Sequence, residues 1–330
     1  MSLSVAGKKA GPIGFGLLGL SRPPAIPYDQ AIKVMKAALN HGANLWNGAE
    51  FYGTPTENSL HLLNHYFTTY PEDAAKVIIT LKGAFTMSMS PPGPQTNTAG
   101  IRQSIDNCLA ILDDKVFLDV FLPARIDPDV PIEETVTAIV EYIKAGKIGG
   151  YGLSECSAQS IRRAHAIHPL SMIEIELSLF ATEIFSNDVA DVCAELHIPI
   201  IAYSPLARGF LAGGIKKAED LPQDDIRRRF PRFQDGALEA NIKLAEKVRE
   251  VAERTGFTMA QVAIAWVRRQ GGRLGTVIPI PGCTTLGRLE DNMRVVEVGE
   301  EELKVLDGLS ERMRVVGERY PEAFLKYTYV

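Results

Sequence analysis

KVIITLKG, residues 76–83, is a run of apolar and β-branched residues that ends in a lysine and a glycine. An apolar run of this length between turn residues is typical of a strand that is buried on both faces of a parallel sheet. Parallel strands need long crossover connections, which are usually helices. The stretch therefore predicts an α/β fold in which helices separate the strands.

Strands and helices alternate along the chain on both sides of this stretch. Helical periodicity is found at 29–39, 60–67, 101–112, 136–143, 159–168, 189–196, 238–254 and 259–269. Strand patterns are found at 11–20, 45–46, 76–83, 116–127, 149–155, 172–180, 198–206 and 275–282. Because there is no linker or change of composition, we predict one (β/α)8 TIM barrel, a single domain over residues 1–330, rather than two doubly wound domains. Insertions near 83–97 and 207–237 both follow predicted strands, so we expect them to overhang the barrel mouth.

The glycines at positions 14, 16 and 19 have the spacing of a dinucleotide-binding fingerprint. That motif needs a helix at its last glycine, whose amino end holds a pyrophosphate. Pro23 and Pro24 follow closely and forbid a regular helix. We therefore interpret the segment as a first strand with a glycine-rich exit.

Composition restricts the class of protein. The chain has 330 residues, 46% of them hydrophobic, and a net charge of −5, which argues against nucleic-acid or anionic-membrane partners. The four cysteines lie far apart, and no His, Asp or Glu cluster has metal-ligand spacing, so we expect reduced thiols and no metal. The amino-terminal sequence lacks a signal-peptide core, and no apolar run is long enough to span a bilayer. We expect a soluble cytoplasmic protein.

The segment NLWNGAEFYG, residues 44–53, places polar side chains just after a predicted strand, where parallel α/β folds carry their chemistry. Tyr52 is the candidate acid, but a tyrosine titrates at about 10 and needs a cationic neighbour to donate a proton near neutral pH. Lys82 ends the next predicted strand, so it would approach Tyr52 and lower the pKa of its phenol. The alternative is a lysine that extends to the solvent at the rim.

Five blocks in order resemble the aldo-keto reductases: NLWNGAEFYG, IITLKG, GLSE, AYSPLARGFLAG and IPIPGCTTLGRLEDN. Within that family the chain is most similar to the fungal pyridoxal reductases, which share the WN…EFYG variant and the ARID-type sequence. The resemblance implies a (β/α)8 barrel that uses NADPH without a Rossmann domain. It also implies reduction of an aldehyde, above all pyridoxal to pyridoxine.

The resemblance assigns a role to each matching residue. Tyr52 matches the general acid, Lys82 its activating lysine, and Asn47 the position of an aspartate beside that lysine. The cofactor-binding positions are Ser154, Glu155 and Glu174 at the nicotinamide carboxamide, Tyr203 stacked on the ring, Ser204, Leu206 and Arg208 at the pyrophosphate, and Gly282, Cys283, Thr284, Arg288, Asp291 and Asn292 at the adenosine end. The chemistry of the last group agrees, because free N–H groups at a helix start favour phosphate and an arginine binds a ribose phosphate with a bidentate fork. A capped helix with a solvent-exposed arginine is the structural alternative.

The chain departs from the family pattern in three ways, one of which is that Glu155 and Glu174 stand where amides are common and could accept from the carboxamide NH2 group. Asn47 replaces the aspartate, so we expect Lys82 to lack an anionic partner there, and Ala124 replaces the histidine that orients the carbonyl. We therefore expect a reduced Tyr52–Lys82 dyad, with the ring hydroxyl groups of pyridoxal helping to orient the substrate. For Arg125 and Asp127 we favour structural roles at the strand exit.

Two further segments have open interpretations. For the basic run Arg227–Arg229 with Arg232 we favour a solvated loop over a lid. The aromatic carboxyl-terminal tail either covers the pocket or packs on the barrel wall.

Other functions remain in competition with pyridoxal reduction. A broader aldo-keto reductase is the second enzymatic hypothesis, and the loss of the histidine argues against it. A cofactor-binding regulatory protein, as in the channel-associated branch of the family, is the alternative without catalysis. The presence of both Tyr52 and Lys82 argues against a purely binding role. The family is often monomeric, and we expect a monomer.

Overall fold

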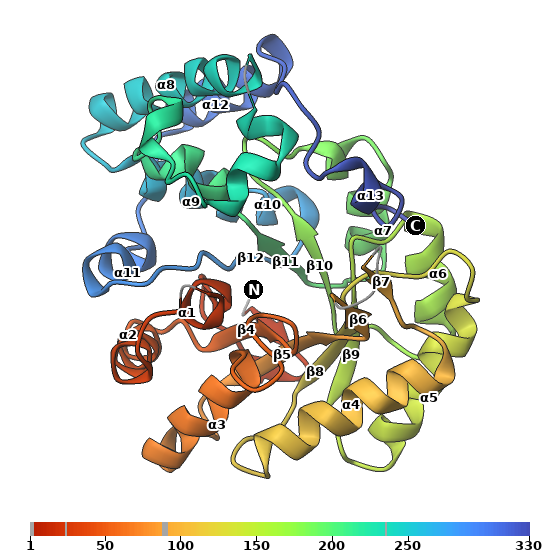
Figure 1. Ribbon diagram of the computed structural model, residues 1–330. Helices are drawn as coiled ribbons and strands as arrows, with labels where there is room; N and C mark the ends of the chain where they lie inside the picture. Colours follow the sequence, from red (N-terminus) through yellow and green to blue (C-terminus); the bar gives the residue numbers. More distant parts are fainter. Residues whose placement is uncertain (1–2, 24, 88–91, 235) are drawn as a thin grey trace.

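The computed structural model describes residues 3–23, 25–87, 92–234 and 236–330. Its main sheet has eight strands in the order β12-β11-β10-β9-β8-β5-β4-β3, and every pair of neighbours is parallel. Two backbone hydrogen bonds, from Gly14 N to Pro279 O (2.9 Å) and from Gly16 N to Pro281 O (3.3 Å), join its two edges. The sheet thus closes into a barrel surrounded by helices (Figure 1), and the predicted (β/α)8 fold is confirmed.

The barrel strands are shorter than the predicted stretches. They are β3 (Phe15–Gly16), β4 (Leu45–Ala49), β5 (Ile78–Gly83), β8 (Val120–Pro123), β9 (Gly150–Ser154), β10 (Met172–Glu176), β11 (Ile200–Tyr203) and β12 (Val277–Pro279). The helices are α1 (Leu18–Ser21), α2 (Tyr28–Asn40), α3 (Ser59–Thr69), α4 (Thr98–Leu112), α5 (Ile132–Lys144), α6 (Ala158–Ile167), α7 (Val189–Glu195), α8 (Ala237–Thr255), α9 (Met259–Arg269), α10 (Gly271–Leu274), α11 (Leu286–Met293), α12 (Glu300–Arg312) and α13 (Glu322–Leu325).

Local signals explain where several helices begin. The side chain of Asn58 accepts hydrogen bonds from the first turn of α3, and Asn97 and Ser157 do the same for α4 and α6. Thr258 and Gln261 form a reciprocal capping box at the start of α9. These caps satisfy backbone N–H groups that have no partner within the helix. The short helix α1 follows the glycine-rich exit of β3 and ends before Pro23, as the prolines require.

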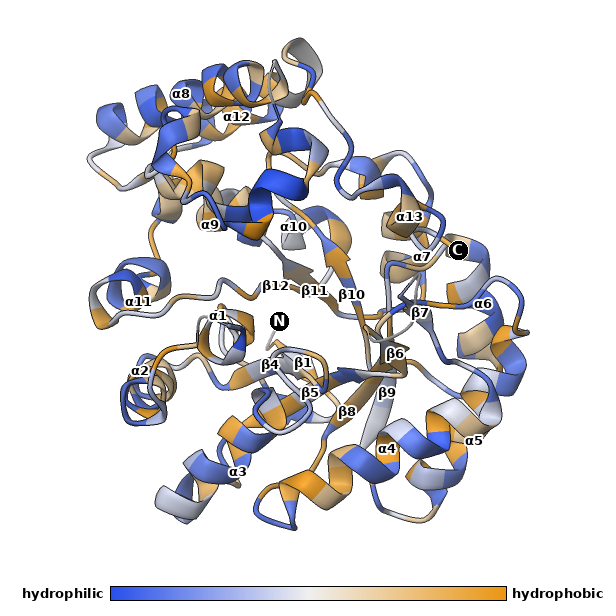
Figure 2. Ribbon diagram, in the orientation of Figure 1, coloured by the Kyte–Doolittle hydropathy of each residue, from blue (hydrophilic) through white to orange (hydrophobic). Residues whose placement is uncertain are grey.

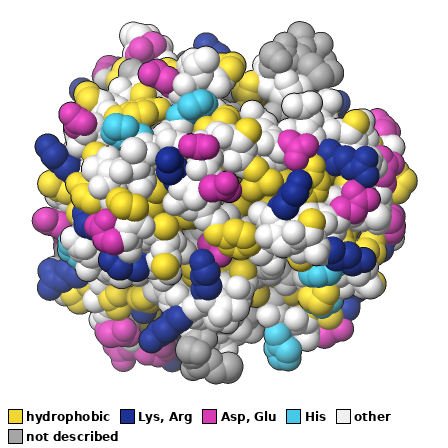
Figure 3. Space-filling model, turned by 90° about the horizontal axis from the view of Figure 1, so that it is seen from below, with side chains coloured by type: hydrophobic (Ala, Val, Ile, Leu, Met, Phe, Trp, Pro, Cys, Tyr) yellow, Lys and Arg dark blue, Asp and Glu magenta, His cyan; other side chains and the backbone are white. Residues whose placement is uncertain are grey.

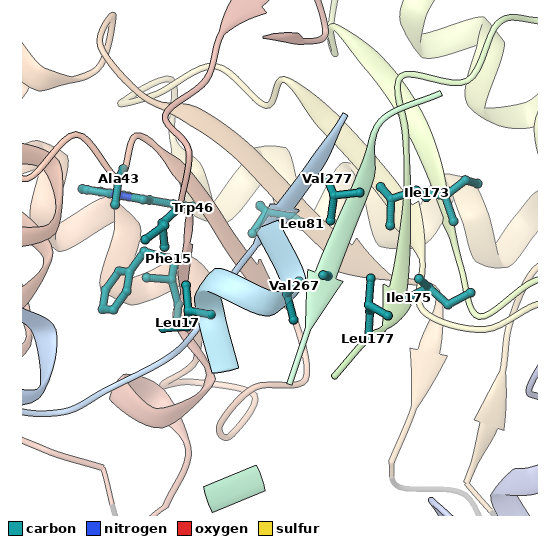
Figure 4. Close-up of a cluster of buried hydrophobic side chains, with 14 of the residues drawn as sticks. Phe15, Leu17, Ala43, Trp46, Leu81, Ile173, Ile175, Leu177, Val267 and Val277 are labelled. Atoms are coloured by element: carbon teal, nitrogen blue, oxygen red, sulfur yellow. The ribbon is translucent and has the colours of Figure 1, made fainter. Parts of the chain in front are cut away.

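Alternation along the strands divides the apolar side chains into two cores. One set lies inside the barrel with two residues of the amino-terminal segment: Val5, Ala10, Leu45, Ile78, Val120, Leu122, Met172, Ile201, Ile278 and Ile280. The other set packs between sheet and helices, and Figure 4 shows Phe15, Leu17 and Trp46 together within it. The helices accordingly have an apolar and a polar side (Figure 2). The interior of the barrel is therefore a packed core.

Both insertions contain short elements of secondary structure. Residues 207–237 form short 3-10 turns, η3 (Ala207–Ala212), η4 (Ala218–Asp220), η5 (Ile226–Arg229) and η6 (Pro231–Phe233). Arg227 pairs with Asp225 at 2.6 Å, and Arg228 donates to three backbone carbonyls of the same loop. The prediction of a solvated basic run holds for the exposed Arg229, but it is wrong for Arg227 and Arg228, which hold the loop together, and for Arg232, which is buried. The other insertion contains the hairpin β6 (Phe85–Thr86) and β7 (Gly93–Pro94), and its residues 88–91 lie outside the described part.

Acidic and basic side chains are interspersed on the face shown in Figure 3. All four cysteines are free and buried, in agreement with the expected thiols. Within the described ranges, no helix combines the length and apolar character that a bilayer span requires. The cytoplasmic location stays a prediction.

Candidate active site

Because side chains alternate along a strand, the candidate residues lie inside the barrel near the carboxyl ends of its strands. Asn47 follows Leu45 by two positions, Lys82 follows Ile78 by four, and Glu174 follows Met172 by two. Because side chains two apart share one face of a strand, each polar residue lies on the same interior face as the apolar residue before it. Lys82, Asn47 and Glu174 are each less than 4% exposed. A buried lysine of this kind requires a partner.

Glu174 is that partner. The Lys82 Nζ atom lies 2.8 Å from Glu174 Oε1 and 3.0 Å from Oε2, and it also donates to Asn47 Oδ1. The Asn47 amide in turn donates to Glu174 Oε2 at 2.6 Å and to Thr80 Oγ1 at 3.0 Å. The expectation of an unpaired Lys82 in a bare Tyr52–Lys82 dyad is therefore wrong. A carboxylate is present, but it comes from β10 on another part of the barrel.

The structure brings Tyr52 next to this buried ion pair. Lys82 Nζ lies 5.1 Å from the centroid of the Tyr52 ring. The Tyr52 loop is fixed by Glu50, whose Oε1 accepts from Ala84 N at 2.9 Å and from Ser104 Oγ at 2.7 Å. Gly83 leaves room for this link, since a Cβ there would lie 2.1 Å from Ser104 Oγ. The loop that follows β4 is thus anchored to the end of β5, which carries Lys82.

The pKa of Tyr52 differs from the sequence prediction. Burial raises the pKa of the phenol, Lys82 opposes this rise, and the net pKa is above the ordinary value for tyrosine. Burial also acts to lower the pKa of Lys82, but the charges of Glu174 and Tyr52 outweigh it and raise that pKa. Lys82 is therefore a firmly protonated ammonium beside a protonated phenol. This arrangement suits an acid that donates a proton and is stabilised afterwards as phenolate.

A second polar cluster at the mouth was not predicted. Arg319 reaches in from the carboxyl-terminal tail, at 2.6 Å from Glu155 Oε2 and 3.2 Å from Glu176 Oε2. The Tyr203 hydroxyl donates to Glu155 at 2.8 Å and lies 2.8 Å from the Tyr320 hydroxyl. The available signal was the sequence MIEIE, because two carboxylates on one buried strand face require cations. Sequence spacing does not reveal that one of the cations lies about 140 residues further on.

The tail therefore lies on the mouth of the barrel. Tyr329 N donates to Glu155 O at 2.6 Å, and Ser157 N donates to Val330 O at 2.9 Å. Figure 1 shows the carboxyl terminus beside α13 and α6 at this edge of the barrel. Of the two interpretations of the tail, contact with the mouth is the one the structure supports.

The predicted cofactor residues occupy a connected band along the mouth. At the nicotinamide end, Ser154 and Glu174 are paired across β9 and β10. Both carboxylate oxygens of Glu155 accept hydrogen bonds, and both carboxylate oxygens of Glu174 contact Lys82. Next to them, Ser204 and Arg208 lie in left-handed backbone, and Arg208 pairs with Glu176 at 3.3 Å. Leu206 packs against the core. The predicted carboxamide contacts of the two glutamates stay predictions.

The adenosine end shows side chains of two kinds. Arg288 is exposed in the first turn of α11, and the amide of the nearly buried Asn292 makes none of the hydrogen bonds found in the described part of the chain. In contrast, Asp291 accepts from Thr258 and Gln261 of the neighbouring helix α9. Cys283 is buried, which raises the pKa of its thiol to about 12. Arg288 and Asn292 are thus available to a ligand, whereas Asp291 and Cys283 have structural contacts.

Backbone contacts bring the remaining adenosine-end residues together. A Cβ on Gly282 would lie 2.9 Å from Gly16 O, so the loop after β12 needs a glycine to pass β3. The Thr284 carbonyl accepts from Gln30 of α2 at 3.3 Å. The loop that leads into α11 is therefore held against the first strand. The helix is capped by Thr285, whose side chain accepts from Arg288 N at 3.4 Å, as in the structural alternative of a capped helix with an exposed arginine.

In the segment after β8, Asp127 makes a structural contact and Arg125 approaches the mouth. The carboxylate of Asp127 accepts from Asp129 N at 3.0 Å, a structural turn contact as predicted. Ala124 is buried, and Arg125 turns toward the mouth, where its Nη1 atom lies 3.5 Å from Ser154 Oγ. The position of the family's histidine is thus followed by an arginine that approaches the site.

Fold and site together define a barrel enzyme with a buried lysine–carboxylate pair beside a tyrosine at the strand ends. The chain belongs to the aldo/keto reductase family, whose model matches residues 12–311. It is an oxidoreductase of the kind that uses a nicotinamide cofactor, as the sequence predicted. Within the described residues there is no cluster of His, Cys, Asp or Glu that could hold a metal ion.

Individual relatives cover almost the whole chain. A probable pyridoxal reductase 2 from Schizosaccharomyces pombe is 39% identical over 326 residues, which are 96% of each protein. Among solved structures, a glycerol dehydrogenase from Gluconobacter oxydans has a TM-score of 0.82 at 23% identity, over 96% of this chain and 97% of that one. A thermostable aldo-keto reductase with the inhibitor epalrestat has a TM-score of 0.70 at 19% identity, over 94% and 99% of the two chains. The two solved structures support the fold alone.

Proposed function

We propose that this protein reduces an aldehyde to an alcohol with NADPH, and that pyridoxal, reduced to pyridoxine, is its substrate. The observation that carries the proposal is the buried Lys82–Glu174 pair beside Tyr52 at the carboxyl ends of the strands. Support for pyridoxal comes from the 39% identical relative, a probable pyridoxal reductase.

Proton transfer is the part of the reaction that the chain's own residues perform. Bound NADPH supplies the hydride that reaches the carbonyl carbon. Tyr52 donates its phenolic proton to the carbonyl oxygen, and the Lys82 ammonium stabilises the phenolate left behind. Glu174 keeps Lys82 protonated, since its charge raises the pKa of that lysine. Asn47 orients the pair, because its amide binds both partners.

The residues present fit NADPH. The exposed guanidinium of Arg288 forms no ion pair within the described ranges. Thr285 caps the amino end of α11 by accepting from Arg288 N at 3.4 Å, so the exposed arginine side chain is the group left for a ligand there. A planar guanidinium at this place would hold the ribose phosphate, and Asn292 would bind the adenine edge. Arg208 and Ser204 would contact the pyrophosphate, and Tyr203 would support the nicotinamide ring.

A broader aldehyde reductase is the second candidate function. Ala124 argues for selectivity, because a substrate without its own polar groups finds no histidine there to orient its carbonyl. A regulatory protein that only binds cofactor has no need for a lysine kept protonated beside a tyrosine. Pyridoxal reduction therefore remains the preferred proposal.

One panel tests the proposal. The purified full-length protein is mixed with NADPH or NADH and with pyridoxal, benzaldehyde, butyraldehyde or glyceraldehyde, and coenzyme oxidation is followed with pyridoxine measured by chromatography. We expect kcat/KM to be highest for pyridoxal and at least about tenfold higher with NADPH than with NADH. Absence of turnover with every aldehyde would refute the enzymatic role, and equal rates across the panel would refute the assignment to pyridoxal. Equal use of NADH would contradict the phosphate role of Arg288.

A further inference from the structure

Arg125 occupies an unusual place in the barrel mouth. It follows Ala124 two residues after Pro123, and Pro123 pairs with Gly83, the residue next to Lys82. Its Nη1 atom donates to Ala124 O at 2.6 Å and lies 3.5 Å from Ser154 Oγ. Its guanidinium carbon lies 5.3 Å from the centroid of the Tyr320 ring. The guanidinium is thus held between the ends of β8 and β9 and the tail.

The other cations at the mouth are neutralised by carboxylates. Lys82 pairs with Glu174 at 2.8 Å, Arg208 with Glu176 at 3.3 Å and Arg319 with Glu155 at 2.6 Å. Arg125 forms no ion pair with any carboxylate in the described part of the chain, and its Nε and Nη2 atoms make none of the hydrogen bonds found there. A half-buried guanidinium with donors to spare is suited to an anion.

We propose that Arg125 binds an anionic oxygen next to the aldehyde of the substrate, which makes it the specificity-determining residue that replaces the missing histidine. The inference rests on the proposed function and names the substrate class as aldehydes with an ionised hydroxyl group on the adjacent ring carbon. Pyridoxal has this feature, since its ring hydroxyl is acidic and ionises at neutral pH. The guanidinium would orient the ring and withdraw the electron density that a phenolate otherwise feeds into the carbonyl.

The neighbourhood of Arg125 favours a phenolate over a more distant phosphate. The guanidinium lies 3.5 Å from Ser154 Oγ, and Ser154 pairs across the strands with Glu174, the partner of Lys82, so an anion bound by Arg125 would lie close to the catalytic pair. A hydroxyl group directly on the ring carbon next to the aldehyde meets that condition more closely than the phosphate ester of pyridoxal 5′-phosphate, which is joined through a CH2–O link to the ring carbon on the other side of the aldehyde.

Arg22 is the alternative anchor. It lies within electrostatic reach of Tyr52, and it forms no ion pair in the described ranges. However, the Arg22 side chain makes none of the hydrogen bonds found in the described part of the chain, whereas the Arg125 guanidinium is held at the strand ends by Ala124 O and Ser154 Oγ. Arg22 therefore serves as the comparison for Arg125.

The test uses two aldehydes that differ by one hydroxyl group: 3-hydroxypyridine-4-carbaldehyde and pyridine-4-carbaldehyde. Each is assayed with NADPH for the wild type and for Arg125→Met, Arg125→Lys, Arg22→Met and the surface control Arg163→Met. Arg163 lies on α6, where it forms an exposed ion pair with Glu133. The quantity compared is the ratio of kcat/KM for the two aldehydes, which is independent of the fraction of folded enzyme. Pyridoxal 5′-phosphate is added as a third substrate.

We expect Arg125→Met to lower the ratio by roughly 10- to 100-fold by slowing only the hydroxylated aldehyde. Arg125→Lys should restore part of the ratio, and Arg22→Met and Arg163→Met should leave it unchanged. An unchanged ratio in Arg125→Met, or a lowered ratio in Arg22→Met, would overturn the assignment. A loss confined to the phosphate ester would show phosphate binding instead and would also overturn it. If the wild type reduces neither aldehyde, the proposed function itself has failed, which is a different result from equal reduction of both.

Discussion

At the residue scale, the negative charge beside Lys82 comes from an unexpected strand. Asn47 on β4 stands where the family pattern has an aspartate, and Glu174 on β10 supplies the carboxylate instead. The exchange keeps one anion beside one cation, so the buried site avoids the cost of an uncompensated charge. The amide of Asn47 then joins the two charged groups rather than replacing one of them.

Glu174→Gln tests this account through the pH dependence. The acid must be protonated, so kcat/KM falls as pH rises through the pKa of Tyr52. Burial and Glu174 both raise that pKa, and therefore loss of the carboxylate lowers it. We expect the alkaline limb of the pH profile to move to lower pH, with kcat reduced about tenfold or more. Profiles of the wild type and the exposed control Glu133→Gln should coincide, and an unshifted limb in Glu174→Gln would contradict the role.

The sequence predicted Tyr52 and Lys82 as neighbours because both are polar residues at the ends of adjacent strands. It did not predict the partner of Lys82, since periodicity shows which face of β10 bears Glu174 but not which side chain meets it across the barrel. The predicted pKa of Tyr52 was wrong for a related reason. Burial is a property of the whole site, and here it outweighs the attraction of one ammonium.

At the scale of elements, a buried aspartate joins the helices that flank β5. Asp73 ends the short turn η1 (Pro71–Asp73) and its carboxylate is 1% exposed. It accepts from Tyr66 of α3 at 2.7 Å and pairs with Lys36 of α2 at 2.5 Å and Lys76 at 2.8 Å. Burial alone would raise the pKa of Asp73, but these three partners lower it to about 2. The segment that leads into β5 is thereby fixed to two helices.

Asp73→Asn should lower the free energy of unfolding by about 2 kcal/mol at pH 7. Because the folded-state pKa is depressed, this stability is present above the unfolded pKa near 4 and is lost as pH falls toward 2. Urea unfolding at pH 7 and pH 3 measures it, and the difference between variant and wild type should shrink at the lower pH. The neighbouring Glu72→Gln removes an exposed carboxylate and should change stability by less than about 0.5 kcal/mol. A pH-independent difference for Asp73→Asn would contradict the ionic origin.

Elements with clear periodicity were predicted well, and those without it were missed. The helix expected at 259–269 is α9 with the same bounds, because its capping box and apolar stripe are both local signals. The amino-terminal hairpin, β1 (Ser4–Val5) with β2 (Lys8–Lys9), was not predicted. Strands of two residues carry no periodicity, and this pair is held by the barrel core that Val5 enters.

At the scale of the whole molecule, the end of the chain returns to the active-site mouth. Arg319 is 5% exposed and links the tail to β9, β10 and the loop after β10 through Glu155, Glu176 and Glu183. Tyr320 contributes a hydroxyl contact to Tyr203. The tail is therefore a wall of the candidate site, and the buried Arg319 guanidinium supplies its ion pairs to the barrel.

Arg319→Met should leave the buried Glu155 without its cation, while Glu176 keeps Arg208, and destabilise the folded state by roughly 3–5 kcal/mol. We also expect faster hydrogen exchange in residues 317–330, because the detached tail lets water hydrate the carboxylates. Hydrogen exchange with mass spectrometry measures the tail, and thermal unfolding measures the rest. The exposed Arg314 provides the control, and Arg314→Met should match the wild type in both measurements. Unchanged exchange in Arg319→Met would contradict the anchoring role.

The barrel itself could be predicted because eight alternations of buried strand and amphipathic helix have few other solutions. The path of the tail could not, since its aromatic residues are equally compatible with the wall and the mouth. The path of the tail is decided by contacts between segments that lie far apart in the chain. Arg319 with Glu155, at a separation of 164 residues, is the clearest case.

The central claim is that Tyr52 protonates an aldehyde while a hydride reaches its carbonyl carbon at this barrel mouth. The most direct measurement uses NADPH deuterated at the transferable position of the nicotinamide, with pyridoxal as the substrate. Mass spectrometry of the product should find one deuterium on the new carbinol carbon with the wild type. The yield with Tyr52→Phe should be about 100-fold lower or less, although that variant still binds NADPH as followed by fluorescence. Undiminished labelling by Tyr52→Phe, or unlabelled product from the wild type, would contradict the claim.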